Sequence, residues 1–153
     1  MRLPIIFAAT LGIAGLAFAA DSIGTVSSSA PFELSGVAMR ADGVSSWPIV
    51  AGDEVRSINA PVIIRFQDGS RITISEQSRL VLVRTGSTLS ANLMSGQAQF
   101  NLTQESSLQV FNLGWRSVAR SGSISTRSVT GGAQVSGPRA EVSRIPPPPV
   151  STK

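Results

Sequence analysis

Apolar and polar residues alternate with a period of two over most of residues 32–136, and this alternation constrains the fold more than any other feature. In residues 71–75, Ile72 and Ile74 alternate with polar side chains, and residues 89–93 and 98–102 repeat the pattern. Successive side chains of a β-strand point to opposite faces of its sheet, so each segment presents one apolar face to a core. The sequence therefore predicts an all-β fold built from short antiparallel strands.

Glycine next to Asp or Ser separates the predicted strands, as expected for tight turns. Asp68-Gly69 lies between residues 62–66 and 71–75 and predicts a hairpin with a two-residue type I′ turn. Residues 80–83 are apolar throughout, which predicts a strand buried on both faces. Strands recur about every 8 to 12 residues without a fixed repeat, and this spacing fits a sandwich, a barrel or a β-solenoid.

The 153-residue chain contains no Cys and no His. This composition excludes catalytic thiols, Ser-His-Asp triads and the usual zinc ligands. Asp53 and Glu54 are the only adjacent acidic residues, and on a strand they point to opposite faces, which argues against a paired acid and nucleophile. Asp53, Glu54 and Asp68 lack the spacing of a calcium-binding loop. The sequence predicts a non-catalytic protein with no cofactor and no metal site.

The first 20 residues have the three-part layout of a secretory signal peptide. Arg2 precedes an apolar stretch, and Ala17 and Ala19 supply small side chains before a cleavage site. We expect residues 1–19 to form the signal peptide, with cleavage after Ala19 or, alternatively, after Ala20; an uncleaved anchor is the other interpretation. No second apolar segment follows, so we expect no transmembrane segment after cleavage and a periplasmic or secreted protein of a bacterial envelope.

Charge is distributed unevenly along the chain. Residues 21–105 hold six Arg and eight acidic residues, a net charge of −2, whereas residues 106–153 hold five Arg and one Lys against Glu141, a net charge of +5. The run from Pro146 to Pro149 favours polyproline II backbone. We therefore predict a β-domain over residues 20–130 and a disordered, Pro-rich, basic tail over residues 131–153. Such a tail is a spacer or a ligand for a peptide-binding groove, and its cations can contact anionic surfaces.

The two tryptophans are the candidate residues for contact with a ligand or partner. Trp47 precedes Pro48 in a loop-like stretch, and Trp115 lies between Gly114 and Arg116. A Trp on a loop can stack on a sugar or anchor a partner protein. The alternative is packing at the edge of the core, where a domain with few aromatic residues needs the volume.

Four arginines, Arg65, Arg71, Arg79 and Arg84, lie on or beside predicted strands. If their side chains share one face, they form a cross-strand ladder that can bind an anion. The alternative is ordinary surface charges paired with Glu76 and Asp68.

The order of several motifs resembles the FecR-like domain of bacterial envelope proteins. Five motifs follow one another as in that family. They are residues 34–37 with Asp42-Gly43, then Gly52-Asp53, Asp68-Gly69-Ser70, the Ser-x-Leu-x-Leu pattern of residues 78–82, and Gly96 before residues 97–100. The resemblance covers residues 32–102 and implies an extracytoplasmic, all-β, non-catalytic module. Family members that regulate iron uptake cross the inner membrane and pass a signal to a cytoplasmic sigma factor. This chain has no such N-terminal region, so we expect a stand-alone FecR-like domain.

These features together predict an exported FecR-like β-domain that binds another envelope component, through protein contacts in envelope signalling or structure. The alternative is a carbohydrate-binding or extracellular matrix protein in which Trp47 or Trp115 contacts glycan. The exported location argues against a nucleic-acid partner.

Overall fold

A computed structural model describes residues 21–103, 106, 108–112, 115–118, 122–129, 132–136 and 141–144 of the chain. The described residues form strands and turns without a helix, which confirms the predicted all-β class. Accordingly, this part of the chain contains no helix with the length and apolar character needed to cross a membrane. The predicted signal peptide lies outside the described residues.

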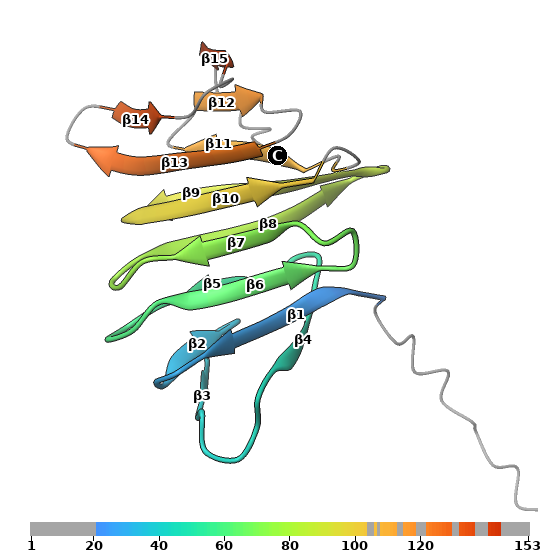
Figure 1. The fold of residues 1–153 in the computed structure, drawn as a ribbon, viewed down its shortest axis with the longest axis vertical. Helices are drawn as coiled ribbons and strands as arrows, with labels where there is room; N and C mark the ends of the chain where they lie inside the picture. Colours follow the sequence, from blue (N-terminus) through green and yellow to red (C-terminus); the bar gives the residue numbers. More distant parts are fainter. Residues whose placement is uncertain are drawn as a thin grey trace, which may run out of the picture.

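Sheet A holds seven strands within the described residues (Figure 1). They are β1 (Ser22–Ser28), β4 (Trp47–Val50), β6 (Val62–Phe66), β7 (Arg71–Ile74), β10 (Gln97–Leu102), β13 (Gly122–Val129) and β14 (Gly132–Ser136). Their order across the sheet is β14-β13-β10-β7-β6-β1-β4.

Sheet B holds eight strands in the same part of the chain. They are β2 (Phe32–Leu34), β3 (Val37–Met39), β5 (Glu54–Arg56), β8 (Arg79–Thr85), β9 (Thr88–Ser95), β11 (Gln109–Asn112), β12 (Trp115–Val118) and β15 (Glu141–Arg144). Their order is β15-β12-β11-β9-β8-β5-β2-β3. The strands β9 and β11 run parallel, and the other described neighbours in both sheets run antiparallel.

The two sheets lie face to face as a sandwich, and the chain alternates between them (Figure 1). The hairpin of β6 and β7 belongs to sheet A, the next hairpin of β8 and β9 to sheet B, and β10 returns to sheet A. Both sheets therefore grow in the same direction, from an end formed by β3 and β4 to an end formed by β14 and β15.

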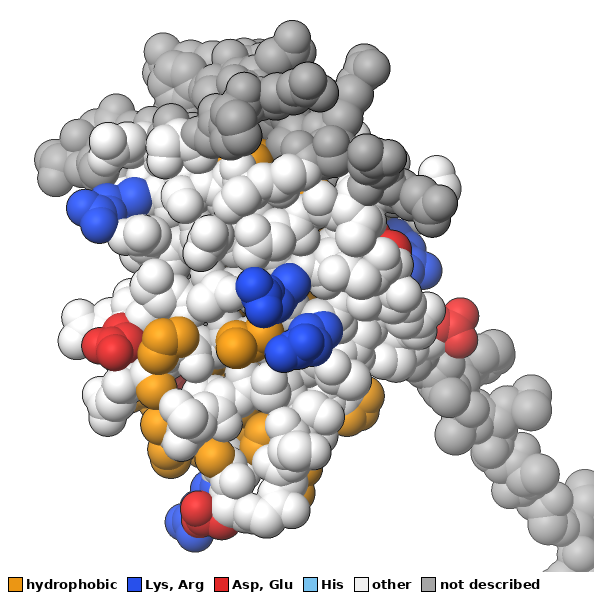
Figure 2. Space-filling view, viewed as in Figure 1, with side chains coloured by type: hydrophobic (Ala, Val, Ile, Leu, Met, Phe, Trp, Pro, Cys, Tyr) orange, Lys and Arg blue, Asp and Glu red, His pale blue; other side chains and the backbone are white. Residues whose placement is uncertain are grey.

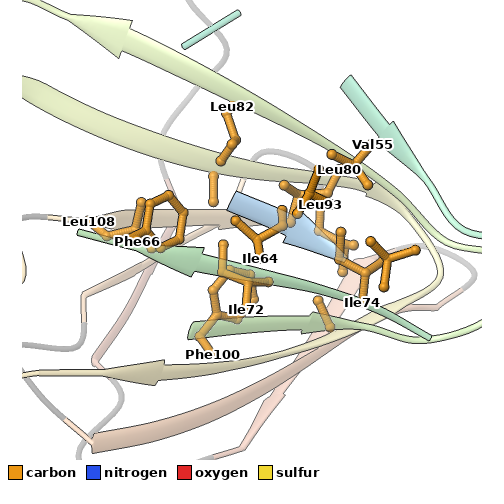
Figure 3. Packing of buried hydrophobic residues seen from close by; sticks show 14 of the residues in the cluster. Val55, Ile64, Phe66, Ile72, Ile74, Leu80, Leu82, Leu93, Phe100 and Leu108 are labelled. Carbon is orange, nitrogen blue, oxygen red and sulfur yellow. The ribbon is translucent and has the colours of Figure 1, made fainter. Parts of the chain in front are cut away.

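The core fills the space between the sheets with the inward residues of the alternating segments. Figure 3 shows Ile64 and Ile72 of sheet A facing Leu80, Leu82 and Leu93 of sheet B, and all five are essentially inaccessible to solvent. Burial of branched aliphatic side chains removes apolar surface from water and is the main stabilising term for such a sandwich.

The hairpin at Asp68-Gly69 forms where the sequence predicts it, but its turn type differs. The N–H of Gly69 donates to the carbonyl of Phe66 (3.1 Å), and the N–H of Phe66 donates to the carbonyl of Ser70 (2.9 Å). Gly69 has a positive φ of 84°, whereas Asp68 does not, and a type I′ turn needs both. The loop is therefore a three-residue turn, Gln67 to Gly69, with glycine in the left-handed position.

The strand predicted to be buried on both faces has one exposed face. Leu80 and Leu82 are buried, but Val83 is 37% exposed, so β8 covers the core with one side only. The pattern of residues 80–83 predicts burial on both faces because a run of apolar residues hides the alternation that a sandwich strand otherwise shows.

Two strands, β14 and β15, lie within residues 131–153, where the sequence predicts a disordered tail. β14 pairs with β13 and β15 pairs with β12. Without β14 and β15, the sheet edges at β13 and β12 would present unpaired backbone N–H and C=O groups, which favour pairing with an extended segment that follows. The proline run lies outside the described residues.

Candidate functional site

The acidic turn residue Asp53 is occupied by hydrogen bonds within the fold. Its Oδ1 accepts from the Ser35 hydroxyl (2.7 Å), and its Oδ2 accepts from the N–H of Val50 (2.8 Å). The N–H of Gly52 donates to the carbonyl of Leu82 (2.7 Å), which ties the turn to β8. This Gly-Asp pair therefore joins the loop between the two sheets to sheet B.

The Asp68-Gly69-Ser70 motif also has a structural role. The Asp68 carboxylate accepts from the Ser70 N–H (2.8 Å) and from the Ser70 hydroxyl (3.1 Å). The N–H of Thr103, at the end of β10, donates to Ser70 Oγ (3.2 Å). The motif thus links the β6–β7 hairpin to the neighbouring strand.

Buried serines satisfy the backbone where the chain crosses between sheets. Ser57 Oγ accepts from the N–H of Ser78 (2.9 Å), and Ser78 Oγ accepts from the N–H of Gln97 (3.0 Å). Gly96 lies against Ser78 so closely that a Cβ atom on Gly96 would overlap the Ser78 side chain. Buried polar groups need such partners, so these residues determine the fold at the crossing.

Two arginine–glutamate ion pairs lie on sheet B. Arg56 on β5 lies directly opposite Arg79 on β8. Arg56 pairs with Glu33 (3.3 Å) and Arg79 pairs with Glu54 (2.6 Å). The hydrogen bond and the charge of Glu54 raise the pKa of Arg79 above its usual range. These pairs line an open cleft of about 760 Å³ on this sheet.

The four candidate arginines do not form one ladder. Arg65 and Arg71 lie opposite each other on sheet A, whereas Arg79 belongs to sheet B. Arg84 lies near the other end of β8, beside a second cleft of about 590 Å³. Arg79 pairs with Glu54 rather than with Glu76. Only Arg65 and Arg71 remain as a candidate cationic pair.

Trp47 packs at the edge of the core. Its ring meets the Phe32 ring edge-on, with centroids 5.3 Å apart and planes at 75°. The side chain is half-buried and contacts the core cluster from β4. Trp115 lies on β12, opposite Arg144 of β15, and its side chain lies outside the described residues. The two tryptophans belong to different sheets at opposite ends of the stack, so they do not form one site.

An apolar surface at the β3–β4 end was missed by the sequence interpretation. Val37 on β3 is 61% exposed and Val44 in the following loop is 47% exposed. Figure 2 shows hydrophobic side chains gathered on the lower part of the molecule, where Figure 1 places β1–β4. The apolar run of residues 37–39, which has no polar residue to alternate with, was the available signal.

The two sheet edges at this end differ. β4 carries Pro48, which has no N–H and cannot donate to an added strand. β3 carries no proline, and among the strands that the structure describes it pairs with β2 alone. An open strand edge beside exposed apolar side chains is a surface that another protein can extend or cover.

Within the described residues, no group of three or more acidic side chains lies close enough together to hold a metal ion. The described surface offers instead an apolar end at β3 and a cationic pair on sheet A. Comparisons of the chain with protein-family models, with curated proteins and with solved structures give no match.

Proposed function

We propose that the chain is an exported, non-catalytic FecR-like β-domain that binds another protein of the bacterial cell envelope, in a signalling or structural role. The observation that carries this proposal is the β3 edge, where Val37 is 61% exposed beside an open strand. Exposed apolar surface next to unpaired backbone groups is costly for a free protein and favours a partner.

The order of turn motifs supports the family assignment in this proposal. Gly52-Asp53 and Asp68-Gly69-Ser70 are used for turns and cross-strand hydrogen bonds, as are Ser78 and Gly96. The motifs therefore specify the scaffold and leave the binding function to the surface. Docking on the β3 edge would add a strand to sheet B, with backbone hydrogen bonds for affinity and side-chain contacts at Val37 for selectivity.

The test compares two valine substitutions that add the same charge at two exposed positions. Val37→Asp changes the β3 edge, and Val83→Asp changes β8, where Val83 is 37% exposed. Wild-type and variant proteins are used to capture partners from detergent-solubilised envelope extract, with quantitative mass spectrometry. We expect at least one envelope protein to be recovered with wild type and Val83→Asp and to be about tenfold depleted with Val37→Asp.

Recovery that does not differ between the two variants for any protein would contradict docking at β3. Export is tested separately, by sequencing the N-terminus of the protein recovered from the periplasm or medium. The expected first residue is Ala20 or Asp21. A chain retained in the cytoplasm with Met1 intact would contradict the envelope location.

A further inference from the structure

Each sheet places two arginines directly opposite each other, but only one of these pairs is neutralised. On sheet B, Arg56 and Arg79 face each other and each forms an ion pair with a glutamate. On sheet A, Arg65 and Arg71 face each other, both are exposed, and neither has an ion pair or a side-chain hydrogen bond within the described residues. Like charges directly opposite each other destabilise a sheet, so the sheet A pair has an energetic cost that sheet B avoids.

On the five central strands of sheet A the rest of the outer face is mostly polar, and the described side chains there include no carboxylate. The described outward side chains of these strands are those of Thr25, Ser27, Ile63, Arg65, Arg71, Thr73, Gln97, Gln99, Asn101, Ser123, Ser125 and Arg127. Figure 2 shows two neighbouring cationic side chains near the middle of this face, with no acidic side chain between them.

Neighbouring residues extend the cationic pair into a row of hydrogen-bonding groups. Thr25 lies opposite Arg65, and Asn101 lies opposite Arg71. Ser123 of β13 in turn lies opposite Asn101 of β10. Farther along β13, Arg127 is held by Gln97 through two hydrogen bonds (3.0 and 2.7 Å), which orients its guanidinium without neutralising it.

We propose that the outer face of sheet A binds an acidic polysaccharide, with Arg65 and Arg71 together binding one carboxylate or sulfate group of the polysaccharide. Directly opposed Cβ atoms lie about 5 Å apart, so both guanidinium groups can donate to the same oxyanion. Arginine is suited to this because its planar fork donates two parallel hydrogen bonds. The Thr, Asn, Gln and Ser side chains around the pair supply partners for sugar hydroxyls. This binding is independent of the protein partner proposed above.

The composition of the face favours a polysaccharide over two other polyanions. A protein surface that binds a lipid membrane carries apolar side chains, and Ile63 is the single apolar residue among the outward residues named above. A single-stranded nucleic acid would be met by aromatic side chains for base stacking, and these outward residues include none. The Asp68 carboxylate in the adjoining turn is occupied by Ser70 and does not cover the pair.

The test uses two double variants with the same change in net charge. Arg65→Gln with Arg71→Gln removes the proposed site, and Arg56→Gln with Arg79→Gln removes the matched pair of sheet B. Binding of the whole exported protein to polygalacturonate, dextran sulfate and neutral dextran is measured by calorimetry. Thermal unfolding shows that each variant is folded. All cations of residues 106–153 are retained in both variants, so nonspecific attraction changes equally.

We expect wild type to bind the two acidic polymers and not neutral dextran. The sheet A variant should bind about tenfold or more weakly, because two charge-assisted contacts are lost, and the sheet B variant should stay within about twofold of wild type. Equal losses in the two variants, or no binding of wild type to either acidic polymer, would overturn the proposal. Binding of wild type to phosphatidylglycerol vesicles through Arg65 and Arg71, without binding to the acidic polymers, would assign the face to lipid and also overturn it.

Discussion

Asn112 of β11 donates a hydrogen bond from its side-chain amide to the hydroxyl oxygen of Thr126 on β13, across the interior between the two sheets. Both side chains are buried. The Ser128 hydroxyl donates to Asn112 Oδ1 (3.1 Å), so one asparagine contacts two residues of the opposite sheet. At this end of the sandwich a polar link adds to the aliphatic packing of Val110 and Ile124.

This link predicts a specific loss of stability. Asn112→Ala should lower the free energy of unfolding by about 2 to 3 kcal/mol, because it leaves the buried Thr126 hydroxyl and the half-buried Ser128 hydroxyl without their partner. Urea unfolding measures the loss, and Gln109→Ala on the outward side of β11 is the control. In a double-mutant cycle, Asn112→Ala and Thr126→Val should be coupled by about 1 kcal/mol. Additive losses would show that the two residues act separately.

Gly96 is predicted to tolerate substitution far less than another turn glycine. Both Gly96 and Gly86 have a positive φ, but a Cβ atom on Gly96 would overlap Ser78, whereas a Cβ on Gly86 meets open space. Gly86→Ala should cost about 1 kcal/mol for backbone strain alone. Gly96→Ala should cost about 3 kcal/mol, because the overlap with Ser78 is added to the strain. Similar losses measured by thermal unfolding would contradict the close approach at Gly96.

Trp47 is predicted to stabilise the β4 end. Trp47→Ala should lower the free energy of unfolding by about 2 kcal/mol, less than for a fully buried tryptophan because the indole is half-buried. Trp47→Phe retains an aromatic ring beside Phe32 and should cost less. Denaturant unfolding of the two variants distinguishes packing from a surface role. Unchanged stability in Trp47→Ala would indicate that the ring serves the surface alone.

The opposed arginines of sheet A are predicted to reduce stability in the free protein. Arg71→Thr should raise the free energy of unfolding by about 0.5 kcal/mol at low salt, because it removes like-charge repulsion and adds a good strand former. Arg79→Thr on sheet B should lower stability, because Glu54 loses its ion pair. Chemical denaturation at two salt concentrations provides the comparison, and the gain in Arg71→Thr should shrink as salt increases. A loss of stability in Arg71→Thr would contradict the repulsion.

Local pattern predicts the central strands and several turns, but it does not predict β1, β4, β14 or β15. The alternation at Ile72 and Ile74 places both residues in the core, as expected. The turn at Asp68 was predicted with the wrong type, because the number of loop residues depends on where the two strands stop pairing. A two-residue loop at Asp68-Gly69 would place Gln67 opposite Ser70, whereas the observed register places Arg65 opposite Arg71 and bonds Phe66 to Ser70, which leaves three residues in the loop.

Long-range pairing determines which sheet each strand joins, and the local pattern does not reveal it. Arg71 and Arg79 are eight positions apart, yet β7 and β8 enter different sheets, so the expected ladder is divided. Asn112 was not singled out, although its spacing from the inward Val110 indicates an inward position. Its partners on β13 are set by sheet order, which the alternation does not encode.

Both sheets add strands in the same direction as the chain proceeds from β3 and β4 to β14 and β15. A strand in this stack pairs with its two flanking strands and faces the opposite sheet, so the sandwich behaves as a quasi-one-dimensional array. Such an array can be lengthened or shortened by whole hairpins at its C-terminal end without repacking the middle. We expect such an array to open by fraying inward from an end, with the most persistent structure in the central strands around β6 to β9.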